Sequence, residues 1–250
     1  MRAGKASSAD CAARALAVAC LAAGSMLAGC GSSDAPGAEE RHLPQGELAG
    51  VYAGRFPCSN CEAIEATLWL RADGAFFLRQ RYVVQDGPQA LPAYARGRWR
   101  WDERTGELVL RAPGPERRLR QLDADRLQLE TASPIAHVVV RDPDAPPFRD
   151  RLRLEGETAV IDGGIAFRDC LTGLAYAATG GAGYGDLRRQ HRRLNRANDP
   201  SLTELDGHVE VVASADGERE VLVVDRFITL KPRTRCPVRD EDRAPAQPAL

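Results

Sequence analysis

The strongest constraint on the fold is a series of short β-type segments that runs through the first half of the sequence. β-Branched, aromatic and alternating residues recur at short intervals, and turn signals such as Asp73-Gly74 and Thr105-Gly106 separate them. The expected strands are 49–56, 66–71, 75–83, 95–101, 107–111, 117–122, 126–130 and 137–141. Short strands at this spacing predict an all-β fold, an antiparallel sandwich or a closed barrel, and we expect a lipocalin-like barrel over residues 47–141.

A second unit follows a segment rich in proline and aspartate. Residues 142–150 read DPDAPPFRD, which is typical of a stiff linker between domains. We expect a second small β-barrel over residues 151–237, with one helix over 185–197. The expected strands are 151–155, 158–161, 165–168, 174–178, 207–214 and 220–231. Strands interrupted midway by one helix are the plan of an OB-like barrel, and residues 238–250 are expected to form a disordered tail.

Two tryptophans two residues apart favour a filled barrel interior. Because side chains alternate along a strand, Trp99 and Trp101 share one face of the sheet, and Arg98 and Arg100 share the other. An aromatic ligand cavity is the alternative. Small barrels usually fill their interiors with side chains, so we expect a packed core.

The N-terminus has the pattern of a lipoprotein signal peptide. Basic residues precede an apolar run over residues 15–28, which ends in Leu27-Ala28-Gly29-Cys30. The run has about 15 residues, whereas a membrane-spanning helix needs about 20. We therefore expect residues 1–29 to be removed, Cys30 to be acylated, and residues 30–46 to form a flexible tether. Gly31 follows the cysteine, which favours an outer-membrane location facing the periplasm; a plain signal peptide with an incidental Cys30 is the alternative.

Four cysteines remain in the mature domains. Cys58, Cys61, Cys170 and Cys236 allow three pairings, and an even number in an oxidising compartment indicates two disulfides. Their spacing favours Cys58 with Cys61 and Cys170 with Cys236, because each pair then lies within one proposed domain. The second pair would be a structural crosslink.

The sequence around the first cysteine pair resembles a known family. Residues 52–76 read YAGRFPCSNCEAIEATLWLRADGAF. This is similar to the Tyr-x-Gly-x-x-Pro-Cys-x-x-Cys-x-Gly-Ile-x-Thr-x-Leu-x-Leu pattern of NlpE-like outer-membrane lipoproteins, which act in copper homeostasis and adhesion sensing. Ala63 stands where the family has glycine, and Ser133 stands where it has glycine before Pro-Ile. The resemblance is looser over the second unit.

The resemblance implies a non-enzymatic lipoprotein that senses copper, redox or surface stress and signals to an inner-membrane sensor kinase of the Cpx type. Reduced Cys58 and Cys61 would suit Cu(I), a soft ion, although no cofactor is required. Two alternatives remain open. One is a structural or small-ligand-binding lipoprotein with inert disulfides, and the other is a thiol oxidoreductase, which would need its first cysteine at a helix N-terminus.

Composition limits which partners and which copper ligands the chain can have. The formal charge is −1, and the basic signal peptide leaves the mature chain near −3, so bulk charge gives no reason to expect a nucleic-acid partner. The mature chain has no methionine, and its four histidines are scattered, so any copper site would depend on Cys58 and Cys61. The arginine-rich stretch 187–196 could contact anionic headgroups or an acidic partner, but a solvated helix face is the simpler interpretation.

Overall fold

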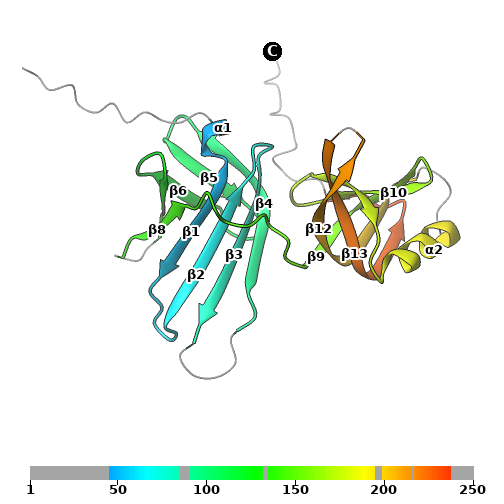
Figure 1. Cartoon of the computed structure of the whole chain (residues 1–250), viewed down its shortest axis with the longest axis horizontal. Helices are drawn as coiled ribbons and strands as arrows, with labels where there is room; N and C mark the ends of the chain where they lie inside the picture. The colour runs from blue at the N-terminus through cyan, green and yellow to red at the C-terminus, as the bar shows by residue number, and fades with distance from the viewer. Residues whose placement is uncertain (1–44, 85–89, 132–134, 195–198, 216, 238–250) are drawn as a thin grey trace, which may run out of the picture. The chain divides into compact units, whose positions relative to one another are not determined.

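Two closed β-barrels account for most of the residues that the computed structural model describes, which are 45–84, 90–131, 135–194, 199–215 and 217–237 (Figure 1). The all-β prediction with two small barrels is confirmed. The signal peptide, Cys30, most of the expected tether and the expected C-terminal tail lie outside the described residues. Within those ranges, neither helix has the length and apolar character needed to cross a bilayer.

The first barrel is an up-and-down barrel in which each strand pairs with the next and the last pairs with the first. Its strands are β1 (Gly50–Phe56), β2 (Ala63–Leu70), β3 (Ala75–Val83), β4 (Ala93–Asp102), β5 (Glu107–Arg111), β6 (Arg117–Gln121), β7 (Arg126–Leu129) and β8 (His137–Arg141). Gly74 and Gly106 take positive φ angles of 81° and 68° in tight turns. Glycine adopts this conformation without steric penalty, which explains why these turns could be predicted.

Side chains fill the core of the first barrel. The buried set includes Tyr52, Phe56, Leu68, Leu70, Phe76, Leu78, Trp99, Leu108, Leu110, Leu119, Leu127 and Val139. Trp99 is buried and Trp101 packs against the same core, as the alternation along β4 predicts. Close packing of this kind favours the filled interior over an aromatic ligand cavity.

A short helix, α1 (Gln45–Leu48), precedes β1 where the sequence suggested the end of the tether. Leu48 is fully buried in the barrel core, and the Tyr52 hydroxyl donates to the Leu48 carbonyl oxygen at 3.0 Å. The Arg141 guanidinium on β8 donates to the carbonyl oxygens of Glu47 and Ala49, both at 2.8 Å. These bonds hold the helix over one end of the barrel (Figure 1).

The second barrel has the strand order β10-β11-β13-β12-β9, closed between β9 and β10. Its elements are β9 (Leu152–Ile161), β10 (Gly164–Asp169), β11 (Ala175–Thr179), α2 (Tyr184–Leu194), β12 (Ser201–Ser214) and β13 (Gly217–Pro232). β11 and β13 are parallel, whereas the other pairs are antiparallel. A helix between the third and fourth strands of a five-stranded barrel is the OB-like plan that the sequence predicts.

Two strand predictions in this barrel were wrong. Residues 151–155 and 158–161 were expected as separate strands but form the single strand β9, because Gly156 does not mark a turn. A Cβ at Gly156 would lie 2.4 Å from the Phe167 ring, so the glycine makes room for that ring inside the barrel. β12 begins at Ser201, six residues before the predicted Gly207, because its first inward-facing side chains are the hydroxyls of Ser201 and Thr203.

Candidate functional site: the Cys58–Cys61 loop

The first cysteine pair lies in the loop that joins β1 to β2. The last cross-strand pair of this hairpin is Phe56 with Ile64, so the chain must reverse within the residues between them. This reversal brings Cys58 and Cys61 to a Cα–Cα distance of 5.2 Å, and the structure joins their sulfurs. Both cysteines are half-buried, whereas Ser59 and Asn60 between them are exposed.

The base of this loop is held by contacts from several strands. The Phe56 ring stacks on the His137 imidazole at the start of β8, with centroids 4.8 Å apart. Arg55 and Glu62 form an ion pair across the loop. The Glu62 backbone N–H donates to the Val83 carbonyl oxygen at 2.9 Å. The loop therefore has a fixed base and a solvent-exposed tip.

The loop does not have the geometry of a thioredoxin-type active site. In that class the first cysteine lies at a helix N-terminus, where the helix dipole stabilises the thiolate. Here both flanking elements are antiparallel strands. The hairpin therefore does not supply the feature that lowers the thiol pKa in oxidoreductases.

Reduction would make the same pair a possible ligand set for Cu(I). Two thiolates only three residues apart match the soft-ligand preference of this ion. Among the described residues, no group of three or more His, Cys, Asp or Glu side chains has an arrangement that could hold a metal ion. A copper site here would therefore depend on the two sulfurs, with no carboxylate or imidazole cage around them.

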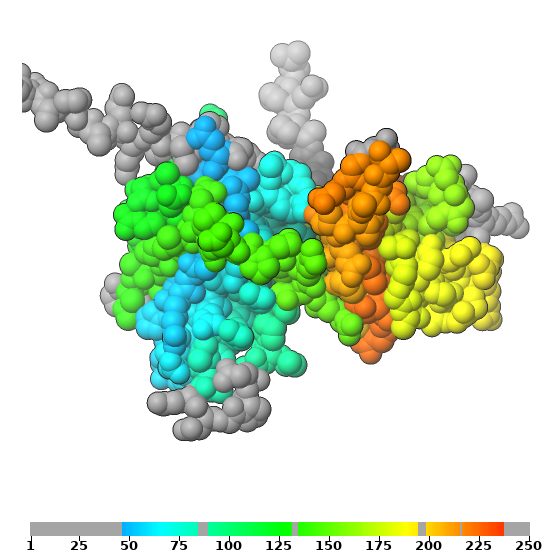
Figure 2. Space-filling view, in the orientation of Figure 1, coloured from blue at the N-terminus to red at the C-terminus, as the bar shows by residue number. Residues whose placement is uncertain are grey.

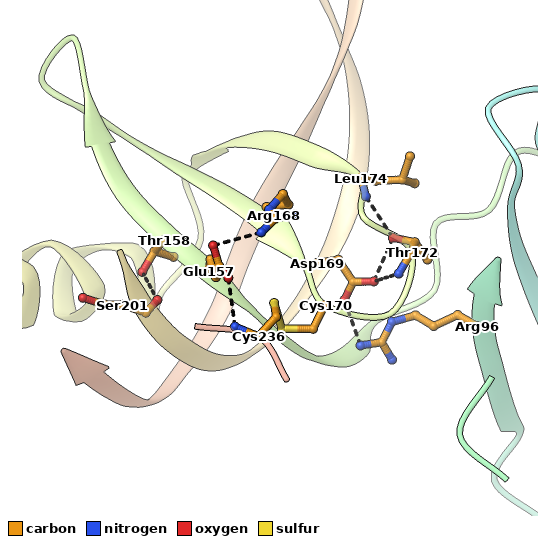
Figure 3. The surroundings of a disulfide bond; sticks show 10 residues. All are labelled: Arg96, Glu157, Thr158, Arg168, Asp169, Cys170, Thr172, Leu174, Ser201 and Cys236. Carbon is orange, nitrogen blue, oxygen red and sulfur yellow. Dashed lines mark hydrogen bonds and ion pairs between the residues drawn. A yellow bond between two sulfur atoms is a disulfide. The ribbon is translucent and has the colours of Figure 1, made fainter. Parts of the chain in front are cut away.

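The second cysteine pair joins the β10–β11 loop to the segment that follows β13 (Figure 3). The Cys170 N–H donates to the Glu155 carbonyl oxygen, and the Cys236 N–H donates to Glu157 Oε1, both at 2.9 Å. Arg168 also donates to the Glu157 carboxylate at 3.0 Å. Although burial raises the pKa of Glu157, the bonds from Cys236 and Arg168 outweigh it and hold the pKa below its usual value.

A buried polar turn beside this disulfide was not identified from the sequence. Asp169 and Thr172 are almost fully buried, and Asp169 Oδ2 accepts bonds from the Thr172 N–H and hydroxyl, both at 2.8 Å. The Arg96 guanidinium donates to the other carboxylate oxygen, Asp169 Oδ1, at 3.1 Å, a bond drawn as a dashed line in Figure 3. Asp-x-x-Thr-Gly is a recognisable turn signal, so the turn itself could have been predicted, whereas its burial could not.

The histidines lie in separate environments. His191 is buried beneath α2, and its Nε2 lies 2.7 Å from the Thr158 hydroxyl. His208 lies between Asp225, at 2.8 Å from Nδ1, and Glu210, at 3.2 Å from Nε2. His137 stacks on Phe56, and His42 lies outside the described residues.

Comparison with known proteins places both barrels in one family. Residues 52–133 match the family model described as the NlpE N-terminal domain, and residues 153–237 match the NlpE C-terminal OB domain. Lipoprotein NlpE of Escherichia coli (strain K12) is 24% identical over 214 residues, which cover 82% of this chain and 85% of that protein. The crystal structure of the Cpx pathway activator NlpE from Escherichia coli is 23% identical, covers 76% of this chain and 98% of that chain, and has a TM-score of 0.34. With both of its domains matched in order, the chain belongs to the NlpE family.

Proposed function

We propose that this chain is an envelope lipoprotein that senses stress and signals to an inner-membrane sensor kinase of the Cpx type. In this proposal Cys30 carries the lipid anchor, the chain faces the periplasm from the outer membrane, and no catalysis is involved. The Cys58–Cys61 loop is the responsive element. The support is the match of both barrels to the NlpE domains, together with the description of the Escherichia coli relative as a Cpx pathway activator.

The observation that carries the proposal is the exposed tip of this loop. A disulfide across so short a ring constrains few residues, and the loop-entropy relation gives it only about 2 kcal/mol of stabilisation. Neither Cys58 nor Cys61 belongs to the hydrophobic core of the first barrel, so we expect reduction of their disulfide to leave the barrel folded. A bond that is accessible and contributes little to folding is suited to reversible chemistry.

Two inputs act on this pair. A thiol reductant supplies two electrons and two protons, which breaks the sulfur–sulfur bond and leaves two thiols. Cu(I) then displaces the thiol protons and binds the two sulfurs. Reduction releases the loop tip from the crosslink, and Cu(I) binding replaces two neutral thiols with a bis-thiolate copper group of charge −1. Both reactions therefore alter the loop tip, where Ser59 and Asn60 are exposed to a partner.

Copper binding is tested by titrating Cu(I) into the reduced mature chain. We expect submicromolar binding that is lost in Cys58→Ser/Cys61→Ser. The matched control is Cys170→Ser/Cys236→Ser, which also removes two sulfurs but leaves the loop pair. Equal binding by both variants, or none by the wild type, would remove copper from the proposal.

Signalling is tested separately from copper. A reporter of the Cpx-type pathway should respond to the full-length protein and change its output when Cys58 and Cys61 are replaced by serine. The anchor is tested by mass spectrometry of the mature N-terminus, where Cys30 should carry acyl groups and Cys30→Ser should not.

The alternative is a structural or small-ligand-binding lipoprotein with inert disulfides. It predicts that reporter output and partner binding do not depend on the redox state of Cys58 and Cys61. An oxidoreductase instead predicts thiol–disulfide exchange turnover that disappears in Cys58→Ser.

A further inference from the structure

The outward face of α2 concentrates positive charge in a chain that is acidic overall. Arg188, Arg189, Arg192 and Arg193 are all exposed, whereas Leu187 and His191 of the same helix are buried. The helix therefore has a buried face toward its barrel and an arginine face toward solvent, here called the α2 arginine face. In Figure 2 the helix, in yellow, forms part of the molecular surface.

This arrangement is unfavourable for the helix by itself. Arg188 with Arg192, and Arg189 with Arg193, are like-charged pairs four residues apart, and such pairs destabilise helices. Asp186 pairs with Arg189, and Arg188 lies over the Tyr184 ring at 5.9 Å. Within the ranges that the structure describes, no carboxylate forms an ion pair with Arg192 or Arg193.

The helix dipole explains only part of this charge. Cations near a helix C-terminus are favourable, which accounts for Arg192 and Arg193 in the last turn of α2. It does not account for Arg188, which lies in the first half of the helix. The repulsion within the α2 arginine face would be relieved by an external anion array.

More basic residues lie beside the last turn of α2. The His191 imidazole contacts the Thr158 hydroxyl, which donates to the Ser201 carbonyl oxygen at 3.2 Å, and Ser201 pairs with Pro232 on β13. Lys231 and Arg233 flank this proline and are exposed, and Arg233 forms an ion pair with Asp199 at 3.6 Å. Leu194 at the end of α2 is 44% exposed, which adds an apolar side chain to the basic surface.

We propose that the α2 arginine face docks on anionic phospholipid headgroups of the membrane that holds the lipid anchor. The inference rests on the anchoring proposed above. Positive charge spread along one helix face fits a fluid layer of phosphates, and an exposed leucine beside it can enter the interface. A lipid chain together with a basic patch is a known combination of membrane signals, in which the second signal strengthens the attachment.

The test is a vesicle-binding assay on the unacylated mature chain, made with Cys30→Ser. The protein should float with vesicles that contain phosphatidylglycerol, stay unbound with pure phosphatidylcholine, and lose binding as salt increases. Because each basic side chain near an anionic surface strengthens binding by about fivefold, Arg188→Gln/Arg192→Gln/Arg193→Gln should bind about 100-fold more weakly.

The control variant removes the same charge elsewhere. Arg104, Arg120 and Arg219 are exposed and lie outside α2, so Arg104→Gln/Arg120→Gln/Arg219→Gln should bind nearly as well as the wild type. Circular dichroism of each variant checks that the fold is retained. Equal weakening by both variants would mean that net charge and not this face drives binding, which overturns the proposal.

Absence of binding to anionic vesicles would also overturn it and would leave an acidic protein surface as the partner to test. Neither result depends on acylation of Cys30 or on signalling. The docking proposal can therefore fail while the proposed function stands.

Discussion

The fold shifts the pKa values of two histidines in the second barrel in opposite directions. His191 is 3% exposed, and among the described residues its Nδ1 has no hydrogen-bond partner. Burial lowers the pKa of His191, so the folded state holds it neutral. For His208, the hydrogen bond to Asp225 outweighs burial and raises the pKa. One imidazole therefore favours the fold in its neutral form and the other in its charged form.

For His191, we expect the free energy of unfolding to fall as pH drops below about 6.5, because the unfolded chain then binds a proton that the folded chain excludes. In His191→Gln this dependence should be weaker. Urea unfolding between about pH 7 and pH 5 measures it. An unchanged slope in the variant would show that His191 does not titrate with unfolding.

For His208 the sign is reversed. Its stabilisation is fully present below about pH 6.5 and is lost as pH rises through the raised pKa of the folded state. His208→Gln should therefore lose stability relative to the wild type at mildly acidic pH and approach it at alkaline pH. The same unfolding experiment, extended upward in pH, checks this; a constant difference across pH would contradict it.

At the scale of strands and helices, one glycine decides how closely β4 and β5 approach. A Cβ on Gly97 would lie 1.8 Å from the Arg111 carbonyl oxygen and 2.9 Å from its carbon. Because both neighbouring atoms belong to the backbone, no side-chain rotation can relieve this overlap. The two strands would have to separate at this point.

Gly97→Ala should therefore destabilise the first barrel by about 3 kcal/mol or more. Gly164→Ala is the matched control, since its Cβ would meet only the Ile161 carbonyl oxygen, at an ordinary 3.5 Å. Denaturant unfolding of both variants gives the comparison. A loss at Gly97 no larger than at Gly164 would mean that the strands separate easily.

The strands of the first barrel could be predicted because their apolar alternation and their turn residues agree. The strands of the second barrel were harder to predict, since glycine, serine and threonine are common in loops. Gly156, Ser201 and Thr203 lie within its strands, and the two hydroxyls point inward. Thr158 Oγ1 lies 2.6 Å from Thr203 Oγ1 inside the barrel, so these polar groups satisfy one another, and no local pattern reveals that. Likewise, the cysteine spacing draws attention to the 58–61 loop, but His137 reaches Phe56 only through closure of β8 onto β1.

At the scale of the whole molecule, the Cys170–Cys236 disulfide links residues 66 positions apart in sequence. Such a crosslink lowers the conformational entropy of the unfolded second barrel, which stabilises the folded state by about 4 kcal/mol in the loop-entropy relation. Its effect on folding therefore exceeds that of the short loop disulfide.

Reduction of the wild-type chain should thus lower the free energy of unfolding of the second barrel by about 4 kcal/mol. Cys58→Ser/Cys61→Ser should show nearly the same loss on reduction, because it retains the long-range bond. Urea unfolding with and without reductant measures both. A large difference between the two proteins would assign the effect to the 58–61 loop instead.

The direction of β1 determines at which end of the first barrel the cysteine loop lies. The chain enters the first barrel through α1 at one end and reaches Cys58 only after the whole of β1, which at the usual rise is a strand of about 23 Å (Figure 1). The Cys58–Cys61 loop thus lies at the end of the first barrel opposite α1. A partner that contacts this loop therefore does so without displacing α1 or the contacts that hold it.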